Sequence, residues 1–302
     1  MGCSSCTCYG KCSPVSPNEE MEVIELEEQA EPRVEPVTYR QDCWEYDRVS
    51  IVESRLQPFR FLKDDGCSPD LGPPEILGDG RMYIGQKDAK GLRCGRGVMK
   101  WEDGSKYIGY WKNDKANGYG RLIHADGDVY EGEWSDDKAC GKGRYLHFLG
   151  NVYEGQWKDD KQEGTGVEKW TDGAYYKGQY KEGKKHGFGE FHWSDLSVYT
   201  GEFVENRIEG KGVHVWKDGR QYEGEWKDNK MHGMGIFIWP DGRIYKGHYV
   251  ADSKEGFGEF HWPNGKKYIG NWHKGKQHGK GVLVSAQGVA KECQWEYGRC
   301  VK

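Results

Sequence analysis

The sequence predicts an all-β fold: an elongated, single-layer antiparallel array of β-hairpin repeats, preceded by a largely disordered N-terminal tail. Three observations support this prediction: a fixed sequence period, an alternation of aromatic residues with glycine, and a composition too polar for a large globular core. Hydrophobic residues make up 35% of the 302 positions, whereas aromatic residues reach 14% and glycine occurs 45 times. A sheet of this kind buries its rings against glycine backbone, so it needs no second layer.

The period is marked by a Tyr-x-Gly motif that occurs nine times. Its tyrosines are 24 residues apart once and 23 residues apart thereafter: Tyr83, Tyr107, Tyr130, Tyr153, Tyr176, Tyr199, Tyr222, Tyr245 and Tyr268. A tenth copy, beginning at Lys291, keeps only its final aromatic residue, Trp295. A period in this range is typical of a linear array of one supersecondary unit. We therefore expect an extended surface, which suits binding better than catalysis.

The first strand of each repeat is indicated by residues spaced two apart. Tyr107, Gly109 and Trp111 fall on one face, because side chains alternate between the two faces of a strand. Six or seven polar residues follow and are predicted to form a turn. A second strand then begins at a Gly-x-Gly pair such as Gly118 and Gly120. We expect an aromatic ring from a neighbouring strand to lie over each glycine.

Each repeat is predicted to close on an Asp-Gly or Asn-Gly turn. These pairs are Asp103-Gly104, Asp126-Gly127, Asp172-Gly173, Asp218-Gly219, Asp241-Gly242 and Asn264-Gly265. They are favoured in two-residue hairpin turns, where both central residues need positive φ. Leu149-Gly150 and Asp195-Leu196 depart from the pattern, and Leu196 is expected to mark a local kink or a contact. The unit is therefore a β-hairpin joined to the next by another tight turn.

The repeated motif resembles the MORN (membrane occupation and recognition nexus) repeat family. The resemblance rests on Tyr-x-Gly-x-Trp, then Gly-x-Gly, then Asp-Gly, in nine copies across about residues 78–300. It implies a twisted all-β array that serves as a scaffold, a membrane-proximal adaptor, or a structural part of cilia and the cytoskeleton. It also implies phosphoinositide binding in some members, so an anionic phospholipid is a possible ligand of the repeats.

The chain is predicted to have four parts. They are a lipidation segment at 1–12, an acidic disordered linker at 13–38, a capping or docking segment at 39–77, and the repeat array at 78–302. Residues 1–76 hold 7 basic and 16 acidic residues, a net charge of −9, whereas the remainder holds 37 and 33, a net charge of +4. The segment at 39–77 is expected to cover an edge strand of the array or to dock a partner.

The extreme N-terminus predicts lipid attachment. Met-Gly-Cys-Ser-Ser-Cys matches the opening of an N-myristoylation site, with Gly2 as the acceptor once the initiator methionine is removed. One myristoyl chain gives only marginal membrane binding, and Lys11 is the single basic residue among the first 30. Cys3 and Cys6 are therefore predicted palmitoylation sites. The alternatives are a cysteine tail without a role or a translation-start artefact. A structural zinc site is not expected, because the cysteines are spaced too closely to form one alone.

Other chemistry is not supported by the sequence. The stretches 178–185 and 270–277 have phosphate-loop spacing but lack the final Ser or Thr, and the repeat itself explains them. Equivalent carboxylates and histidines lie along the array, so no catalytic residues, metal ligands or cofactor are assigned. A net charge of +4 over the repeats is too weak for a nucleic-acid groove.

The sequence thus favours a non-catalytic scaffold held at the cytoplasmic face of a plasma or ciliary membrane, with protein partners bound by the repeats. The candidate partner-binding residues are Trp193, Trp216, Trp239 and Trp262, whose alternative role is to cover neighbouring glycines. Two other functions stay open. One is a structural component of a ciliary axoneme, with axonemal or cytoskeletal partners, and the other is a phosphoinositide-sensing subunit of a separate enzyme.

Overall fold

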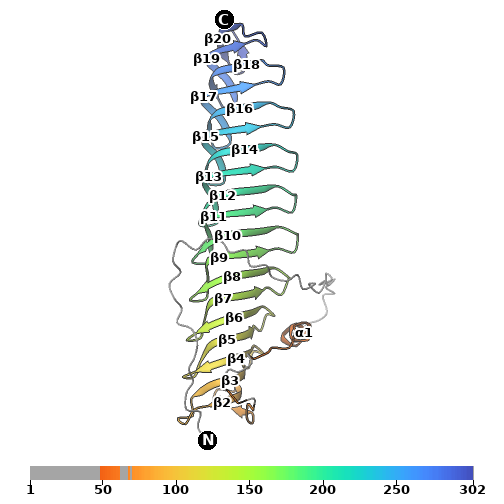
Figure 1. Cartoon of the computed structure of the whole chain (residues 1–302), viewed down its shortest axis with the longest axis vertical. Helices are drawn as coiled ribbons and strands as arrows, with labels where there is room; N and C mark the ends of the chain where they lie inside the picture. Colours follow the sequence, from red (N-terminus) through yellow and green to blue (C-terminus); the bar gives the residue numbers. More distant parts are fainter. Residues whose placement is uncertain (1–47, 62–66, 69, 302) are drawn as a thin grey trace. The chain divides into compact units, whose positions relative to one another are not determined.

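The computed structural model describes residues 48–61, 67–68 and 70–301, and it confirms the predicted all-β class (Figure 1). The chain divides into two compact units, with the boundary between Thr171 and Asp172. Each unit is an antiparallel sheet in which strands adjacent in sequence are adjacent in space. One helix, α1 (Arg48–Arg55), is present among the described residues and belongs to the first unit.

The strands of the first unit are β1 (Glu75–Ile76), β2 (Met82–Lys87), β3 (Arg93–Lys100), β4 (Lys106–Lys112), β5 (Lys115–Ile123), β6 (Val129–Ser135), β7 (Lys138–Leu146), β8 (Val152–Lys158) and β9 (Lys161–Lys169). Those of the second are β10 (Tyr175–Lys181), β11 (Lys184–His192), β12 (Val198–Val204), β13 (Arg207–Val215), β14 (Gln221–Lys227), β15 (Lys230–Ile238), β16 (Ile244–Val250), β17 (Ser253–His261), β18 (Lys267–His273), β19 (Lys276–Val284), β20 (Ala290–Glu296) and β21 (Arg299–Cys300). The polar segments that the sequence predicted as turns are therefore mostly strand.

Two kinds of turn alternate along each unit, and the prediction for the Asp-Gly pairs was wrong. At Asp218-Gly219 only the glycine has positive φ, at 82°, and its N–H donates to the carbonyl of Trp216. The two-residue turns with positive φ at both positions lie instead at the other end of the hairpins, from β4–β5 onward. Asp228 and Asn229, with φ of 49° and 62°, form one of them. Asp and Asn tolerate this left-handed conformation better than other side chains, which accounts for their frequency there.

The second residue of these turns also ties each hairpin to the one before it. The side-chain oxygen of Asn229 accepts the N–H of Ile208 at 2.8 Å, while the N–H of Asn229 donates to the carbonyl of Ile208 at 3.1 Å. Asp252 makes the same reciprocal pair with Met231. We call this pair of hydrogen bonds the clasp. It satisfies backbone groups that lie beyond the regular ladder.

Leu196 occupies a position where other repeats carry glycine. Its φ is 73°, its N–H still donates to the carbonyl of Trp193, and its side chain is 72% exposed. The turn geometry is therefore retained rather than kinked, at the cost of a strained backbone. A leucine in the left-handed region is less stable than glycine by about 1 kcal/mol.

We therefore expect Leu196→Gly to stabilise the second unit by about 1 kcal/mol, because it relieves this strain without removing buried contacts. Urea denaturation followed by circular dichroism measures the change. Leu149→Gly is the matched control, since Leu149 is also exposed, at 64%, but has no positive φ. Equal effects of the two substitutions would contradict the argument from strain.

The repeat tyrosines form the core of both units, on what we call the tyrosine face of each sheet. All nine are at most 3% exposed. A Cβ added to Gly224 or Gly235 would lie 2.6 or 2.4 Å from the Tyr222 hydroxyl, so one ring covers two paired glycines. The hydroxyl donates to the carbonyl of Glu225 at 2.9 Å. For Gly235 the covering ring comes from the neighbouring strand β14, as expected, whereas for Gly224 it comes from the glycine's own strand; in both cases the ring is that of Tyr222.

Candidate binding surfaces

The predicted lipidation residues Gly2, Cys3 and Cys6 lie outside the described residues, as does the predicted linker. The four predicted partner-binding tryptophans are all described and lie in the second unit. Each follows the last residue of a second-strand segment, at the entrance to the Asp-Gly type of turn, and each is half-buried. Their rings therefore border the tyrosine face along one side.

These four tryptophans form a ladder with rings from the adjacent strands. Centroid distances between successive rings run from 4.2 to 5.6 Å, which is the range of favourable aromatic contact. The order is Phe191, Trp193, His214, Trp216, Phe237, Trp239, Phe260 and Trp262. We call this set the aromatic ladder. Its rings pack against each other rather than over glycine, and part of each tryptophan surface is still exposed.

Cations lie against the ladder. The guanidinium carbons of Arg220 and Arg243 are each 5.3 Å from the ring centres of Trp216 and Trp239. The Lys254 ammonium lies 4.9 to 5.1 Å from four rings, those of Trp239, Tyr245, Phe260 and Trp272. Burial lowers the pKa of Lys254 to about 8, and the nearby Arg243 adds to the shift. The ring faces stabilise the charged form by cation–π attraction.

His214 stands where three other repeats have phenylalanine. Its ring is stacked between Trp193 and Trp216, at 4.9 and 4.2 Å, and its Nε2 has no hydrogen-bond partner among the described residues. Burial lowers the pKa of His214 to about 4, the carboxylate of Asp195 opposes this shift, and Arg220 adds to it. The imidazole is therefore neutral at neutral pH and acts as a flat ring in the ladder.

The lowered pKa of His214 predicts that the fold loses stability in acid and that His214→Phe reduces this loss. Because the folded pKa lies below the ordinary 6.5, the unfolded chain binds the proton first, and stability falls as pH drops from about 6.5 towards 4. His214→Phe should retain the stacking and lose less melting temperature than the wild type between pH 7 and pH 4.5. Thermal denaturation at both pH values measures this, with His248→Phe, at an exposed strand position, as the control. An unchanged pH profile would contradict the prediction.

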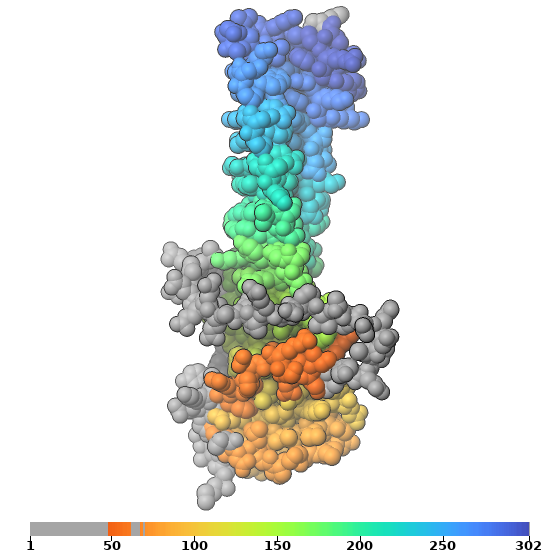
Figure 2. Space-filling view, turned by 90° about the vertical axis from the view of Figure 1, so that its right-hand side faces the viewer, coloured from red at the N-terminus to blue at the C-terminus, as the bar shows by residue number. Residues whose placement is uncertain are grey.

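The other face of the first unit, which we call the opposite face, is covered in part by residues 48–61 of the predicted capping or docking segment; we call these residues the docking segment from here on. Val49 and Val52, 4% and 6% exposed, pack against Ile123 and Val129, which are 2% and 3% exposed. Figure 2 shows the segment, in orange, lying across the strands of this unit. This part of the opposite face thus accommodates an amphipathic helix, and we call it the first seat.

Aromatic and polar contacts complete the docking. The Phe59 ring stacks on Tyr119 at 5.9 Å, and the Phe61 ring meets Tyr110 edge-on at 5.4 Å. Arg121, 7% exposed, donates to the carbonyl of Gln57 and pairs with Glu131. The contacts of Phe59 and Phe61 extend the interface beyond the helix into the segment that follows it.

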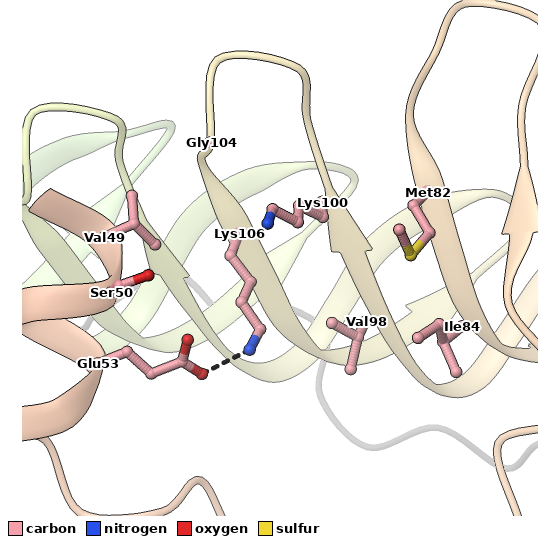
Figure 3. Close-up of a pocket in the computed structure, with 9 residues that line it drawn as sticks. All are labelled: Val49, Ser50, Glu53, Met82, Ile84, Val98, Lys100, Gly104 and Lys106. Atoms are coloured by element: carbon pink, nitrogen blue, oxygen red, sulfur yellow. Dashed lines mark hydrogen bonds and ion pairs between the residues drawn. The ribbon is translucent and has the colours of Figure 1, made fainter. Parts of the chain in front are cut away.

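Glu53 of the helix pairs with Lys106 at 2.5 Å, beside a hollow of about 190 Å³ that Figure 3 shows. Met82, Ile84 and Val98 form its apolar wall. The hollow is too small for a drug-sized ligand. We interpret it as the edge of the first seat that the helix leaves uncovered.

The opposite face of the second unit carries exposed apolar side chains. Phe188, Met234 and Phe257 are 58%, 50% and 54% exposed, and Ile238 is 38% exposed. Sequence reasoning missed this face, because the aromatic repeat drew attention to its other side. The available signal was a run of β-branched residues out of phase with the tyrosines, such as Ile236, Ile238 and Ile244.

The described residues hold no group of three or more His, Cys, Asp or Glu side chains arranged to bind a metal ion. Within the same part of the chain, no helix has the length and apolar character needed to cross a bilayer.

Tandem hairpins with one buried tyrosine each define a β-hairpin repeat protein. The MORN repeat pattern matches nine consecutive segments: residues 83–106, 107–129, 130–147, 153–175, 176–198, 199–219, 222–242, 245–267 and 268–289. The chain therefore belongs to the MORN repeat family, as the sequence resemblance predicted.

Solved structures that resemble the chain include the TCP10 domain of Danio rerio CPAP in complex with a peptide of Danio rerio STIL. It is 13% identical, with a TM-score of 0.37, over 74% of this chain and 99% of that one. The SAS-4 TCP domain of Drosophila melanogaster with a proline-rich motif of Ana2 is 16% identical, with a TM-score of 0.34, over 61% and 99%. These TM-scores are below 0.5, so the likeness carries no argument about function. The comparison with curated proteins finds no match.

Proposed function

We propose that this protein is a non-catalytic scaffold that binds protein partners through its MORN repeats and is held at the cytoplasmic face of a membrane by N-terminal acyl chains. The observation that carries the binding role is the surface of the second unit, which leaves the tryptophans of the aromatic ladder half-buried and several apolar side chains on the opposite face exposed. Contiguous exposed apolar surface in a folded protein marks an interaction site. The four ladder tryptophans are candidate contacts.

Anchoring rests on the N-terminal sequence, with Gly2 as the myristoylated residue and Cys3 and Cys6 as palmitoylated residues. Two acyl chains give stable attachment where one gives marginal attachment. We expect Gly2→Ala to abolish alkyne-myristate incorporation and to move the protein from the membrane to the soluble fraction. Cys3→Ser with Cys6→Ser should keep the myristate label but lose most of the membrane fraction.

Incorporation and fractionation that are unchanged in Gly2→Ala would overturn the anchor. Two alternatives have distinct outcomes. Co-sedimentation with detergent-extracted axonemes favours a structural role in a cilium. Binding of residues 78–302 to phosphoinositide vesicles, but not to phosphatidylcholine vesicles, favours direct lipid sensing by the repeats.

A further inference from the structure

The opposite face of the second unit repeats the seat on which the docking segment lies in the first unit. Five repeats separate the two, so a residue and its equivalent differ by 115 in number. Ile123 pairs with Val129 across β5 and β6, and their equivalents Ile238 and Ile244 pair in the same register across β15 and β16. The backbone of the seat is thus present twice.

At two central positions the side chains of the second seat are more apolar than those of the first, whereas at its margins Glu225 and His261 stand where the first seat has Tyr110 and Leu146. Tyr119, which lies under Phe59, corresponds to Met234, and Arg121 corresponds to Ile236. The ion pair of the first seat, between buried Arg121 and half-buried Glu131, therefore has no counterpart at Ile236. A seat without this pair favours an occupant that contributes aliphatic side chains at that point.

Exposure differs sharply between the two seats. Ile123 and Val129 are 2% and 3% exposed beneath the helix, whereas Ile238 is 38% exposed and Ile244 is half-buried. Met234 is 50% exposed. The second seat therefore exposes to water apolar surface that the first seat buries. Burying this surface under a partner would contribute favourable hydrophobic free energy to binding.

Resting on the proposed scaffold function, we propose that Met234, Ile236, Ile238 and Ile244 form a docking site for a partner protein. The occupant is an amphipathic helix with aliphatic residues at positions i and i+3, followed by an extended segment with an aromatic residue. Val49 and Val52 have this spacing, and Phe59 follows them. The helix lies with its aliphatic residues on Ile238 and Ile244, and the aromatic ring lies on Met234.

The occupant is a different protein rather than a second copy of this chain. In each copy the one described segment with this chemistry is already seated on its own first unit, with Val49 and Val52 4% and 6% exposed. A second copy would have to release that contact in order to bind. Self-association through this face is therefore an outcome that would overturn the proposal.

The test uses a fluorescent synthetic peptide with the sequence of residues 48–61 as the probe and the full chain as the receptor. Fluorescence anisotropy measures its affinity, and a benzophenone at the position of Val52 locates it by cross-linking and mass spectrometry. We expect saturable binding with cross-links in β14–β16. Met234→Lys with Ile238→Lys should weaken binding at least about tenfold, because two apolar contacts become charged.

Val204→Lys with Val250→Lys is the matched control. Both valines are exposed on the same face, at 39% and 48%, and both correspond to Lys112 of the first unit. This control adds the same charge, and binding should stay within about twofold. Lysine also occurs naturally at the positions equivalent to Met234 and Ile238, namely Lys142 and Lys169, so all four substitutions are compatible with the fold.

Three results would overturn the proposal. They are no saturable binding of the peptide, an equal loss of peptide affinity in both double variants, and cross-links confined to β5–β7. The last would mean that the peptide displaces residues 48–61 of the receptor chain from the first seat. A concentration-dependent dimer that Met234→Lys with Ile238→Lys disrupts would replace the partner with a second copy. Failure of the scaffold function is distinguishable from these results. Proximity labelling in cells would compare the wild type with Met234→Lys/Ile238→Lys and with Trp216→Ala/Trp239→Ala. If neither double variant changes the set of labelled proteins, the repeats do not bind partners, and the scaffold function itself is wrong.

Discussion

Gly235→Ala is expected to destabilise the second unit by roughly 3 kcal/mol or more. The added Cβ would lie 2.4 Å from Cε2 and from the hydroxyl of Tyr222, a ring with no exposed surface. Tyr222 cannot yield, because it packs edge-on against Trp226 and Tyr249 at 5.1 and 5.3 Å. Urea denaturation followed by tryptophan fluorescence measures the loss.

Gly173→Ala separates this clash from the general cost of replacing a glycine. Gly173 has a φ of 88°, and an added Cβ would meet nothing within 4 Å, so alanine there costs only backbone strain of about 1 kcal/mol. Gly235 has no such φ. If both substitutions lower the free energy of unfolding equally, the Tyr222 ring does not exclude a Cβ at Gly235, and the argument from the clash is wrong.

Val52→Asp is expected to release the docking segment from the first unit. Val52 is 6% exposed against Ile123 and Val129, and a carboxylate there loses the apolar contact and is itself desolvated. The combined cost of at least about 3 kcal/mol raises the open population on the order of 100-fold. Tryptic cleavage after Arg55 should accelerate accordingly, because proteolysis follows the open state when reclosing is fast.

Ser54→Asp is the control, since it adds the same charge on the exposed side of the same helix. It should leave the cleavage rate within about threefold of the wild type. Rapid cleavage of the wild-type segment would show that the docked state is too short-lived to serve as the precedent for the second seat.

The fold class and the family were predictable because the Tyr-x-Gly motif recurs every 23 or 24 residues and can be counted without a structure. Strand alternation placed Tyr107, Gly109 and Trp111 on one face, and their registers agree with that placement. The turn types were not predictable from dipeptide preference alone. Asp218-Gly219 has a preferred hairpin sequence, yet the hairpin places its both-positive turn at Asp228-Asn229, where the clasp adds stability.

The candidate surfaces were predictable only in part. The tryptophans stood out in sequence, but their mutual stacking through His214 and Phe237 depends on neighbouring strands, which a period does not describe. The seat of α1 was less visible still. Its Ile123 and Val129 resemble any strand residues until the helix is seen to bury them. Residues 1–47 lie outside the described part of the chain, so the lipidation residues stand on sequence alone.

The clasp gives the array a direction. The N–H groups of Ile208 and Met231 each donate to a side chain 21 residues later, in the turn of the next hairpin. The hydrogen bonding of one hairpin is therefore completed by the hairpin that follows it and not by the one before it. Where glycine replaces Asp or Asn, as at Gly275 and Gly298, only the backbone arm remains, from those glycines to the carbonyls of Lys254 and Gln277. The links between successive hairpins are therefore unequal, because Gly183, Gly275 and Gly298 stand at this turn position without a side-chain acceptor. A chain shortened from its C-terminal end would leave the forward N–H of its new last hairpin without the side-chain acceptor of the next.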